Sequence, residues 1–293
     1  MLIVIVGPTG SGKTEIAIEL AKFYRAPIIN ADAFQIYQDM NIGTAKIDRN
    51  SEDYNLHYLL DIKKPSEAYS VKEYQENFRK VYLELKKNHQ TIIVCGGTGL
   101  YIKAALYDYS FEEEDNADIS DLEQLSNEQL ADILNKLDPK AFETIHMNNR
   151  KRVIRAIQIA RTHDKNKSET IEAQEHKLFF KDEQVKFVFL NPNREQLYEN
   201  INARVDSMFE KGLIEEVKRL LNKYQLSHTA KAAIGYKEVI EYLEGKFTLE
   251  ECKELIKKRS RNYAKRQVTF FKHQLPCKEY ASKEELLKEF IHE

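Results

Sequence analysis

The 293-residue chain has few cysteines, no long apolar run near its start and almost no net charge, and each shortage argues against a class of protein. Its three cysteines, Cys95, Cys252 and Cys277, lie far apart without C-x-x-C spacing, which disfavours a disulfide framework and a zinc knuckle. The apolar run at 2–6 is too short for a signal-peptide core or a bilayer span. We therefore expect a cytoplasmic protein with no membrane partner.

The charges nearly cancel, because 45 Lys and Arg stand against 47 Asp and Glu and leave a net charge of −2. That balance by itself gives no hint of a polyanionic partner. The two signs are nevertheless separated along the chain, since residues 111–143 carry eleven acids against two lysines, whereas 150–161 carry five basic residues and no acid. A small net charge is therefore compatible with a nucleic-acid partner.

Strand-like and helix-like segments alternate over much of the chain. The β-branched and leucine run at 2–6 is typical of a central parallel strand, and apolar residues at helical spacing follow from Thr14 to Tyr24. Further strands are expected at 26–31, 91–95 and 185–190, and further helices at 71–87, 196–209 and 249–272. The alternation predicts an α/β fold with a parallel sheet flanked by helices. We expect a core domain formed by 1–109 and 184–293, and an all-helical insertion domain at 110–183.

A phosphate-binding motif, G-x-x-x-x-G-K-[ST], lies between the first strand and the first helix. Its residues are Gly7, Pro8, Thr9, Gly10, Ser11, Gly12, Lys13 and Thr14. In this P-loop arrangement, as in nucleoside triphosphatases, backbone N–H groups and the helix N-terminus converge on phosphate oxygens, Lys13 adds charge, and the Thr14 hydroxyl suits Mg²⁺. A nucleotide and an organic diphosphate present similar oxygens, so phosphoryl transfer and diphosphate departure both stay open.

A carboxylate follows the second expected strand, whereas none follows the third. Nucleoside triphosphatases usually place an Asp after an apolar strand to hold Mg²⁺, but here 91–95 runs into Gly96-Gly97-Thr98. Asp32 instead reaches the carboxyl end of the sheet, where α/β proteins bind ligands. It is a candidate site residue, although a helix cap or a turn also explains an Asp at this place.

The chain resembles the tRNA dimethylallyltransferases, also called tRNA isopentenyltransferases, over nearly its whole length. Besides the phosphate loop, the resemblance is carried by ADAFQIY (31–37), NIGTAK (41–46), LDI (60–62), GGTGLY (96–101), RVIRA (152–156), GL and EV (212–213, 216–217), AIGYKE (233–238) and KRQ (265–267). The family transfers a dimethylallyl group from its diphosphate to N6 of the adenosine just 3′ of the anticodon, with Mg²⁺. The resemblance implies the same activity here, with dimethylallyl diphosphate and the tRNA anticodon stem-loop as partners.

The resemblance also implies roles for individual residues. It assigns catalysis to Asp32, Thr9, Lys13 and Arg204, diphosphate binding to the eight loop residues, and metal binding to Thr14. A carboxylate at Asp32 suits the reaction because the adenine amine is a poor nucleophile, and a guanidinium at Arg204 suits the charge that builds on diphosphate. The residues implied to contact tRNA are Asp32, Ala33, Phe34, Gln35, Thr98, Lys151, Arg152, Arg155, Gly235, Tyr236, Lys237, Lys265, Arg266 and Gln267.

Several of these assignments have ordinary explanations beside them. By pattern alone Arg204 is a surface arginine, Thr98 caps a helix, and the basic helix faces near Lys151 and Lys265 are solvated surfaces. Ala33 stands where many relatives carry Ser, so any role of that hydroxyl in holding diphosphate or adenosine is in doubt here.

Two other functions stay open from the sequence. A nucleotide or small-molecule kinase would use the same loop for ATP. A nucleotide-gated RNA-binding module would use the loop and the basic helices without chemistry. For the tRNA dimethylallyltransferase that the resemblance implies, we expect a monomer.

Overall fold

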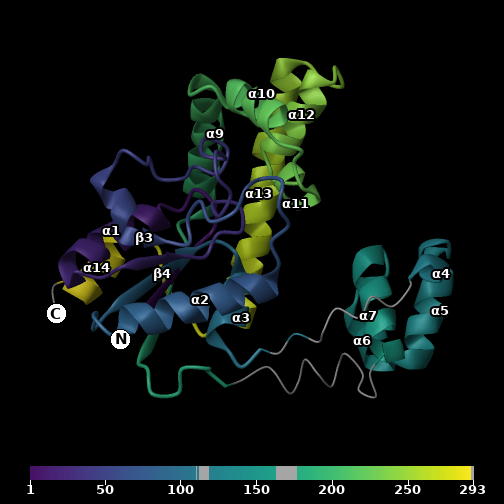
Figure 1. Cartoon of the computed structure of the whole chain (residues 1–293), viewed down its shortest axis with the longest axis horizontal. Helices are drawn as coiled ribbons and strands as arrows, with labels where there is room; N and C mark the ends of the chain where they lie inside the picture. Colours follow the sequence, from purple (N-terminus) through teal and green to yellow (C-terminus); the bar gives the residue numbers. More distant parts are fainter. Residues whose placement is uncertain (110, 112–118, 163–176, 292–293) are drawn as a thin grey trace. The chain divides into compact units, whose positions relative to one another are not determined.

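The computed structural model describes residues 1–109, 111, 119–162 and 177–291. A six-stranded parallel sheet with the order β3-β2-β4-β1-β5-β6 forms the centre of the larger of its two units (Figure 1). The strands are β1 (Leu2–Val6), β2 (Ile28–Asn30), β3 (His57–Tyr58), β4 (Ile92–Gly96), β5 (Val185–Leu190) and β6 (Lys278–Tyr280). The α/β fold with a parallel sheet is confirmed.

β1 is an interior strand of the sheet and is buried on both faces. All five of its residues are fully buried, as the continuous apolar run predicts for a strand covered by helices. Leu2 lies opposite Ile92 of β4 on one side and Val185 of β5 on the other. The carboxyl ends of β1 and β4 therefore lie at the same edge of the sheet, followed by the phosphate loop and the glycine-rich turn.

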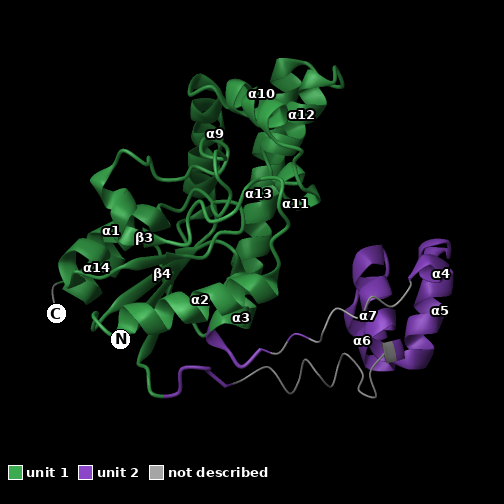
Figure 2. Ribbon diagram, in the orientation of Figure 1, with its two compact units in different colours: residues 1–105, 182–293 green, residues 106–181 purple. Residues whose placement is uncertain are grey.

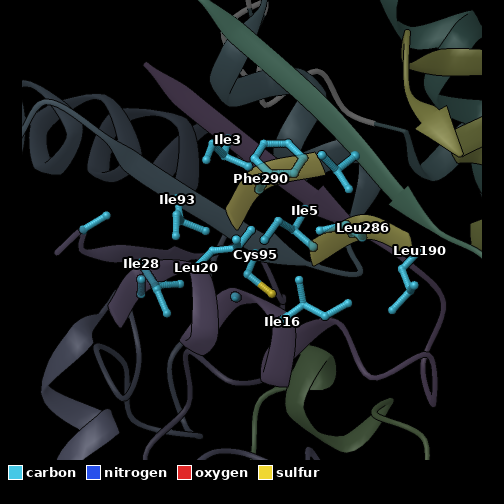
Figure 3. Packing of buried hydrophobic residues seen from close by; sticks show 14 of the residues in the cluster. Ile3, Ile5, Ile16, Leu20, Ile28, Ile93, Cys95, Leu190, Leu286 and Phe290 are labelled. Atoms are coloured by element: carbon cyan, nitrogen blue, oxygen red, sulfur yellow. The ribbon is translucent and has the colours of Figure 1, made fainter. Parts of the chain in front are cut away.

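Helices cover both faces of this sheet. The helices of this unit are α1 (Lys13–Tyr24), α2 (Val71–Lys86), α3 (Gly99–Leu106), α9 (Arg194–Glu210), α10 (Leu213–Lys223), α11 (His228–Lys231), α12 (Tyr236–Leu243), α13 (Leu249–Gln274) and α14 (Lys283–Ile291), with a 3₁₀ helix η1 (Glu52–Leu56). On one face, Ile16 of α1 and Leu286 of α14 pack in one core cluster with Ile5 (Figure 3). On the other, Phe271 of α13 packs on Phe189 at 5.5 Å between ring centroids.

The second unit, residues 106–181, is built around its own apolar core (Figure 2). Its helices are α4 (Ser120–Glu123), α5 (Asn127–Leu137), α6 (Pro139–Thr144) and α7 (Arg150–Thr162). Leu130, Leu134, Val153 and Ile157 pack between α5 and α7. The acidic residues at 112–118 lie outside the described part of the chain.

Two short strands differ from the sequence prediction. β3 and β6 are the edges of the sheet and span only two and three residues, too few for a period of two to be recognised. Over the described ranges, no helix is long and apolar enough to cross a membrane.

Candidate functional site

The phosphate loop links β1 directly to α1. Gly10 and Gly12 have φ angles of 83° and 87°, in the left-handed region that glycine adopts without strain. Gly12 is the N-cap of α1 and places no side chain over the first turn, so the helix N-terminus is left without a side-chain cap. Unpaired N–H groups and the positive end of the helix dipole make this turn a site for an anion.

Asp32 is held in a defined orientation after β2. Its Oδ1 accepts hydrogen bonds from the N–H groups of Phe34, at 2.9 Å, and Gln35, at 3.4 Å. Asn30 fixes the turn from the other side, because its Oδ1 accepts the Asp32 N–H at 3.2 Å and its own carbonyl accepts the Tyr74 hydroxyl at 3.0 Å. Within the described structure no hydrogen bond engages Oδ2 of Asp32, so this oxygen can accept a proton from a ligand.

The glycine-rich turn after β4 lies against the Asp32 segment. Thr98 donates its N–H to the Ala31 carbonyl at 3.1 Å, and its hydroxyl oxygen accepts the Ala33 N–H at 3.0 Å. A Cβ at Gly96 would lie 2.1 Å from the Ala31 carbonyl oxygen, which requires glycine there. Thr98 therefore positions Ala33, the residue next to Asp32. This contact uses the backbone N–H of Ala33, so it does not require a hydroxyl on that side chain.

Arg204 reaches the same site from α9. Its Nη2 donates to the Thr44 carbonyl at 3.4 Å, and this carbonyl also accepts Gln35 Nε2 at 3.1 Å. Burial lowers the pKa of Arg204, and the charge of Asp32 opposes that shift. The structure thus places Arg204, which is half-buried, in the lining of the same cavity as Asp32, whereas the helix pattern alone favours a surface arginine.

Lys13 is the second cation, after Arg204, that interacts with the carboxylate of Asp32. Burial lowers the pKa of its ammonium, Cys95 and Asp32 raise it, and the positive charge of Arg204 lowers it further. Two like charges held together at a partly desolvated place are costly unless an anion joins them. Two cations against one carboxylate leave a net charge of about +1, so the charge balance of these side chains favours an anionic ligand.

A cavity of about 290 Å³ contains these groups. Its polar lining includes Thr9, Lys13, Thr14, Asp32, Gln35 and Arg204. Its apolar lining includes Ile201, Val205, Met208, Ala233, Ile234 and Ile256, from α9, the segment before α12, and α13. One cavity therefore offers a charged end for phosphate and an apolar wall for hydrocarbon.

Tyr263 is a cavity residue that the sequence did not single out. Burial raises the pKa of its hydroxyl to about 12, the charge of Asp32 raises it too, and the hydroxyl of Thr98 opposes the shift. The guanidinium of Arg266 lies 5.6 Å from the centroid of its ring. In the sequence Tyr263 is one aromatic residue among several on a basic helix, and no local pattern separates it from them.

Glu216 is a second residue missed in the sequence, although it belongs to a segment that carries the family resemblance. Its carboxylate is 2% exposed and accepts the N–H groups of Asn41, Ile42 and Gly43 and the hydroxyl of Tyr236, at 2.6 to 3.3 Å. These hydrogen bonds fix the loop whose Thr44 carbonyl accepts the hydrogen bond from Arg204. A signal was present, because a Glu three residues after Leu213 and four before Leu220 occupies the apolar face of a helix.

We expect Glu216→Ala to lower the free energy of unfolding by about 3 kcal/mol, because the buried Tyr236 hydroxyl and three partly buried N–H groups lose a charged acceptor together. Urea denaturation followed by circular dichroism measures this change. Glu215→Ala, at an exposed position of the same helix, is the control and should stay within about 0.5 kcal/mol of the wild type. Equal stability of the two variants would contradict the role assigned to Glu216.

The residues proposed to contact tRNA fall into different environments. Lys151 and Arg152 are exposed on α7 of the second unit, where Arg155 donates to Gln158 at 2.8 Å. Lys237, Lys265 and Arg266 are exposed in the first unit. Phe34 and Gln35 line the cavity, and Gly235 has a φ of 95° at the start of α12. Tyr236 and Gln267 are 1% and 6% exposed, and both side chains are engaged by protein groups.

Comparison with known proteins gives a consistent result. The sequence profile of a family described as IPP transferase matches residues 35–274. A tRNA dimethylallyltransferase of Anoxybacillus flavithermus is 43% identical over 94% of this chain and 88% of its own, and one of Bacillus licheniformis agrees equally well.

Solved structures agree with the sequence comparison. A tRNA isopentenylpyrophosphate transferase of Staphylococcus epidermidis superimposes with a TM-score of 0.70 at 37% identity, covering 99% of this chain and 97% of its own. A eukaryotic dimethylallyltransferase acting on tRNA superimposes with a TM-score of 0.81 at 27% identity, covering 99% of this chain and 76% of its own.

Proposed function

This chain belongs to the IPP transferase family, and on that premise we propose how its residues carry out the reaction. The enzyme is a tRNA dimethylallyltransferase, which prenylates N6 of the adenosine 3′ of the anticodon, position 37, and releases diphosphate. The observation that supports the assignment of residues is the single cavity in which Lys13, Arg204 and Asp32 meet an apolar wall. A diphosphate occupies the charged end, and the dimethylallyl group lies against Val205 and Met208.

Bond breaking takes place at the charged end. As the allylic C–O bond breaks, negative charge builds on the departing diphosphate, and this charge is neutralised by the loop N–H groups, Lys13 and Arg204. The same bond-breaking leaves cationic character on the allyl group, which the apolar wall shields from water. The exocyclic N6 of adenosine then forms the new bond to the allylic carbon, and the diphosphate keeps the electron pair of the broken bond.

Proton transfer takes place at Asp32. The N6 amine shares its lone pair with the purine ring, so its nucleophilicity rises when a carboxylate accepts one of its protons. Oδ2 of Asp32 is the acceptor, because Oδ1 is already occupied by the N–H groups of Phe34 and Gln35. The Thr98 turn holds the segment of Asp32 in place through its hydrogen bond to Ala33.

The chemistry of the site also fits Mg²⁺. The described residues include no cluster of three or more His, Cys, Asp or Glu that would cage a metal. Mg²⁺ keeps several waters and binds through few protein ligands plus substrate phosphates, and the Thr14 hydroxyl at the cavity would be one of these ligands. When bound, the ion would add positive charge to the departing diphosphate.

For RNA binding we propose phosphate contacts by Lys151, Arg152 and Arg155 on α7, and by Lys237, Lys265 and Arg266 in the first unit. A base within the anticodon loop must leave its stack to reach a cavity, and cationic side chains can then hold the flanking backbone. Exposure of Lys151, Arg152, Lys237, Lys265 and Arg266 supports this role.

Lys151→Ala and Lys265→Ala are each expected to weaken tRNA binding and to reduce the slope of log Kd against log salt concentration by about one. The reason is that each phosphate contact releases about one counterion. Fluorescence anisotropy with labelled tRNA over a series of salt concentrations measures the slope. Lys87→Ala, whose ammonium pairs with Glu84 after α2, is the control and should leave the slope unchanged.

The activity itself is tested with purified protein, unmodified tRNA, dimethylallyl diphosphate and Mg²⁺. Nucleoside mass spectrometry should find isopentenyladenosine in digested tRNA. ATP-dependent phosphorylation without use of the diphosphate ester would instead indicate a kinase. Binding of tRNA without any product would indicate a module without chemistry.

A further inference from the structure

Gln267 joins two turns that come from distant parts of the chain. Its Oε1 accepts the N–H of Thr9 at 2.9 Å, and its Nε2 donates to the carbonyl of Gly97 at 2.8 Å. The side chain is 6% exposed. One amide therefore links the phosphate loop after β1 to the glycine-rich turn after β4.

The contact with the second turn is close. A Cβ at Gly97 would lie 2.4 Å from Nε2 of Gln267, so the turn admits the amide only because residue 97 is glycine. The neighbouring Gly99 makes a similar approach to the ring of Phe270, also on α13, where a Cβ would lie 2.2 Å from Cδ1 of that ring. α13 is thus packed directly on the backbone of the turn that carries Thr98.

Both turns contribute to the proposed reaction. Thr9 belongs to the loop that holds the diphosphate, and Gly97 precedes Thr98, which hydrogen-bonds Ala33 next to Asp32. We propose that Gln267 is a positioning residue that sets the spacing between the diphosphate and the base, and not a contact to RNA. This inference rests on the proposed function of the cavity.

The alternative is an RNA contact, because Lys265 and Arg266 precede Gln267 on the same helix. Residues two apart on a helix are rotated by about 200°, so Gln267 points away from the face that Lys265 exposes. Both polar atoms of the amide are already used by protein groups, and little of the side chain reaches solvent. The geometry therefore favours the link between the turns.

Spacing matters here because the allylic carbon and N6 must approach within about 3 to 3.5 Å for the bond to form. Misplacement by about 1 Å reduces such a rate by about a hundredfold. Gln267→Met preserves length and apolar packing but removes both hydrogen bonds. We expect it to lower kcat/KM for dimethylallyl diphosphate by about a hundredfold, while the salt slope of tRNA binding stays at the wild-type value.

Gln267→Glu is the second variant and has the shape of glutamine. Only its protonated form can donate to Gly97 while accepting from Thr9, and burial raises the pKa of a glutamate. We expect the ratio of variant to wild-type kcat/KM to rise as the pH is lowered from about 8 to about 6. Circular dichroism at both pH values shows whether the fold stays the same, so that a recovery of kcat/KM without a change of fold reports on the two hydrogen bonds.

The control is Lys87→Ala, which should leave both the salt slope and kcat/KM for dimethylallyl diphosphate at the wild-type values. The proposal is overturned if Gln267→Met reduces the salt slope and leaves kcat/KM for dimethylallyl diphosphate unchanged. If Gln267→Met does not fold by circular dichroism, Gln267→Glu decides, and failure to recover at low pH overturns the proposal. An inactive wild-type enzyme would instead refute the proposed function.

Discussion

Asp32→Asn is expected to reduce the rate of prenyl transfer by a factor of about 10² to 10⁴, the usual contribution of a general base. The isosteric amide can keep its oxygen toward the N–H groups of Phe34 and Gln35, because those donors require an acceptor. Its NH₂ group then faces the cavity, where it donates instead of accepting and cannot take the N6 proton. Single-turnover formation of isopentenyladenosine, with prebound tRNA, measures the chemical step.

Affinity for inorganic diphosphate should not fall in this variant. Asp32 opposes the charge of the bound anion, so its neutralisation is expected to leave the Kd equal or lower, as isothermal titration calorimetry can show. Asp39→Asn is a matched control in the same segment, because Asp39 pairs with Lys223 and Tyr224 outside the cavity. A wild-type rate in Asp32→Asn would exclude this carboxylate as the base.

Lys13→Met is the second substitution with a large expected effect. It removes one of two cations that neutralise the departing diphosphate, and loss of one such group costs about 10² to 10³ in rate. We expect kcat to fall by that factor and the Kd for inorganic diphosphate to rise. Lys22→Met is the control, because Lys22 lies on the same helix with an exposed side chain and an ion pair to Asp53.

The affinity for diphosphate is also expected to depend on pH through Lys13. Burial lowers the pKa of Lys13 from its ordinary value of 10.5 in the ligand-free protein. Diphosphate binds the charged form, so affinity is complete below the lowered pKa and is lost as the pH rises through it. Calorimetry across this range should show the affinity for diphosphate beginning to fall at a lower pH than a lysine with an ordinary pKa would give. In Lys13→Met this pH-dependent fall should be absent.

The sequence predicted those parts of the molecule whose signals are local. The strand at 2–6, the glycine-rich loop and the helix to Tyr24 are contiguous, so periodicity and motif reinforce each other. Arg204 was a site residue only through family resemblance, because its hydrogen bond to Thr44 and its charge interaction with Asp32 join residues that are far apart in the sequence. The edge strand β6 is three residues long and carries no periodic signal.

The contacts of Gln267 and Glu216 could not be predicted from the sequence. Thr9 and Gln267 are 258 residues apart, and no local pattern can show that they share a hydrogen bond. Glu216 accepts hydrogen bonds from backbone N–H groups of a loop, and these donors have no signature in the side chains of residues 41–43. Long-range contacts through the backbone therefore require the structure.

The place of β5 in the sheet has a consequence for biosynthesis. β1 lies between β4 and β5, but β5 begins at residue 185, after the whole second unit has been made. At about 5 to 20 residues per second, β1 waits roughly 10 to 40 seconds on the ribosome before its second neighbour exists. During that time one edge of the most apolar strand is unpaired, which exposes the nascent chain to aggregation. Residues 106–181 have their own apolar core and can fold meanwhile, before β5 pairs with β1 and before β6 completes the sheet.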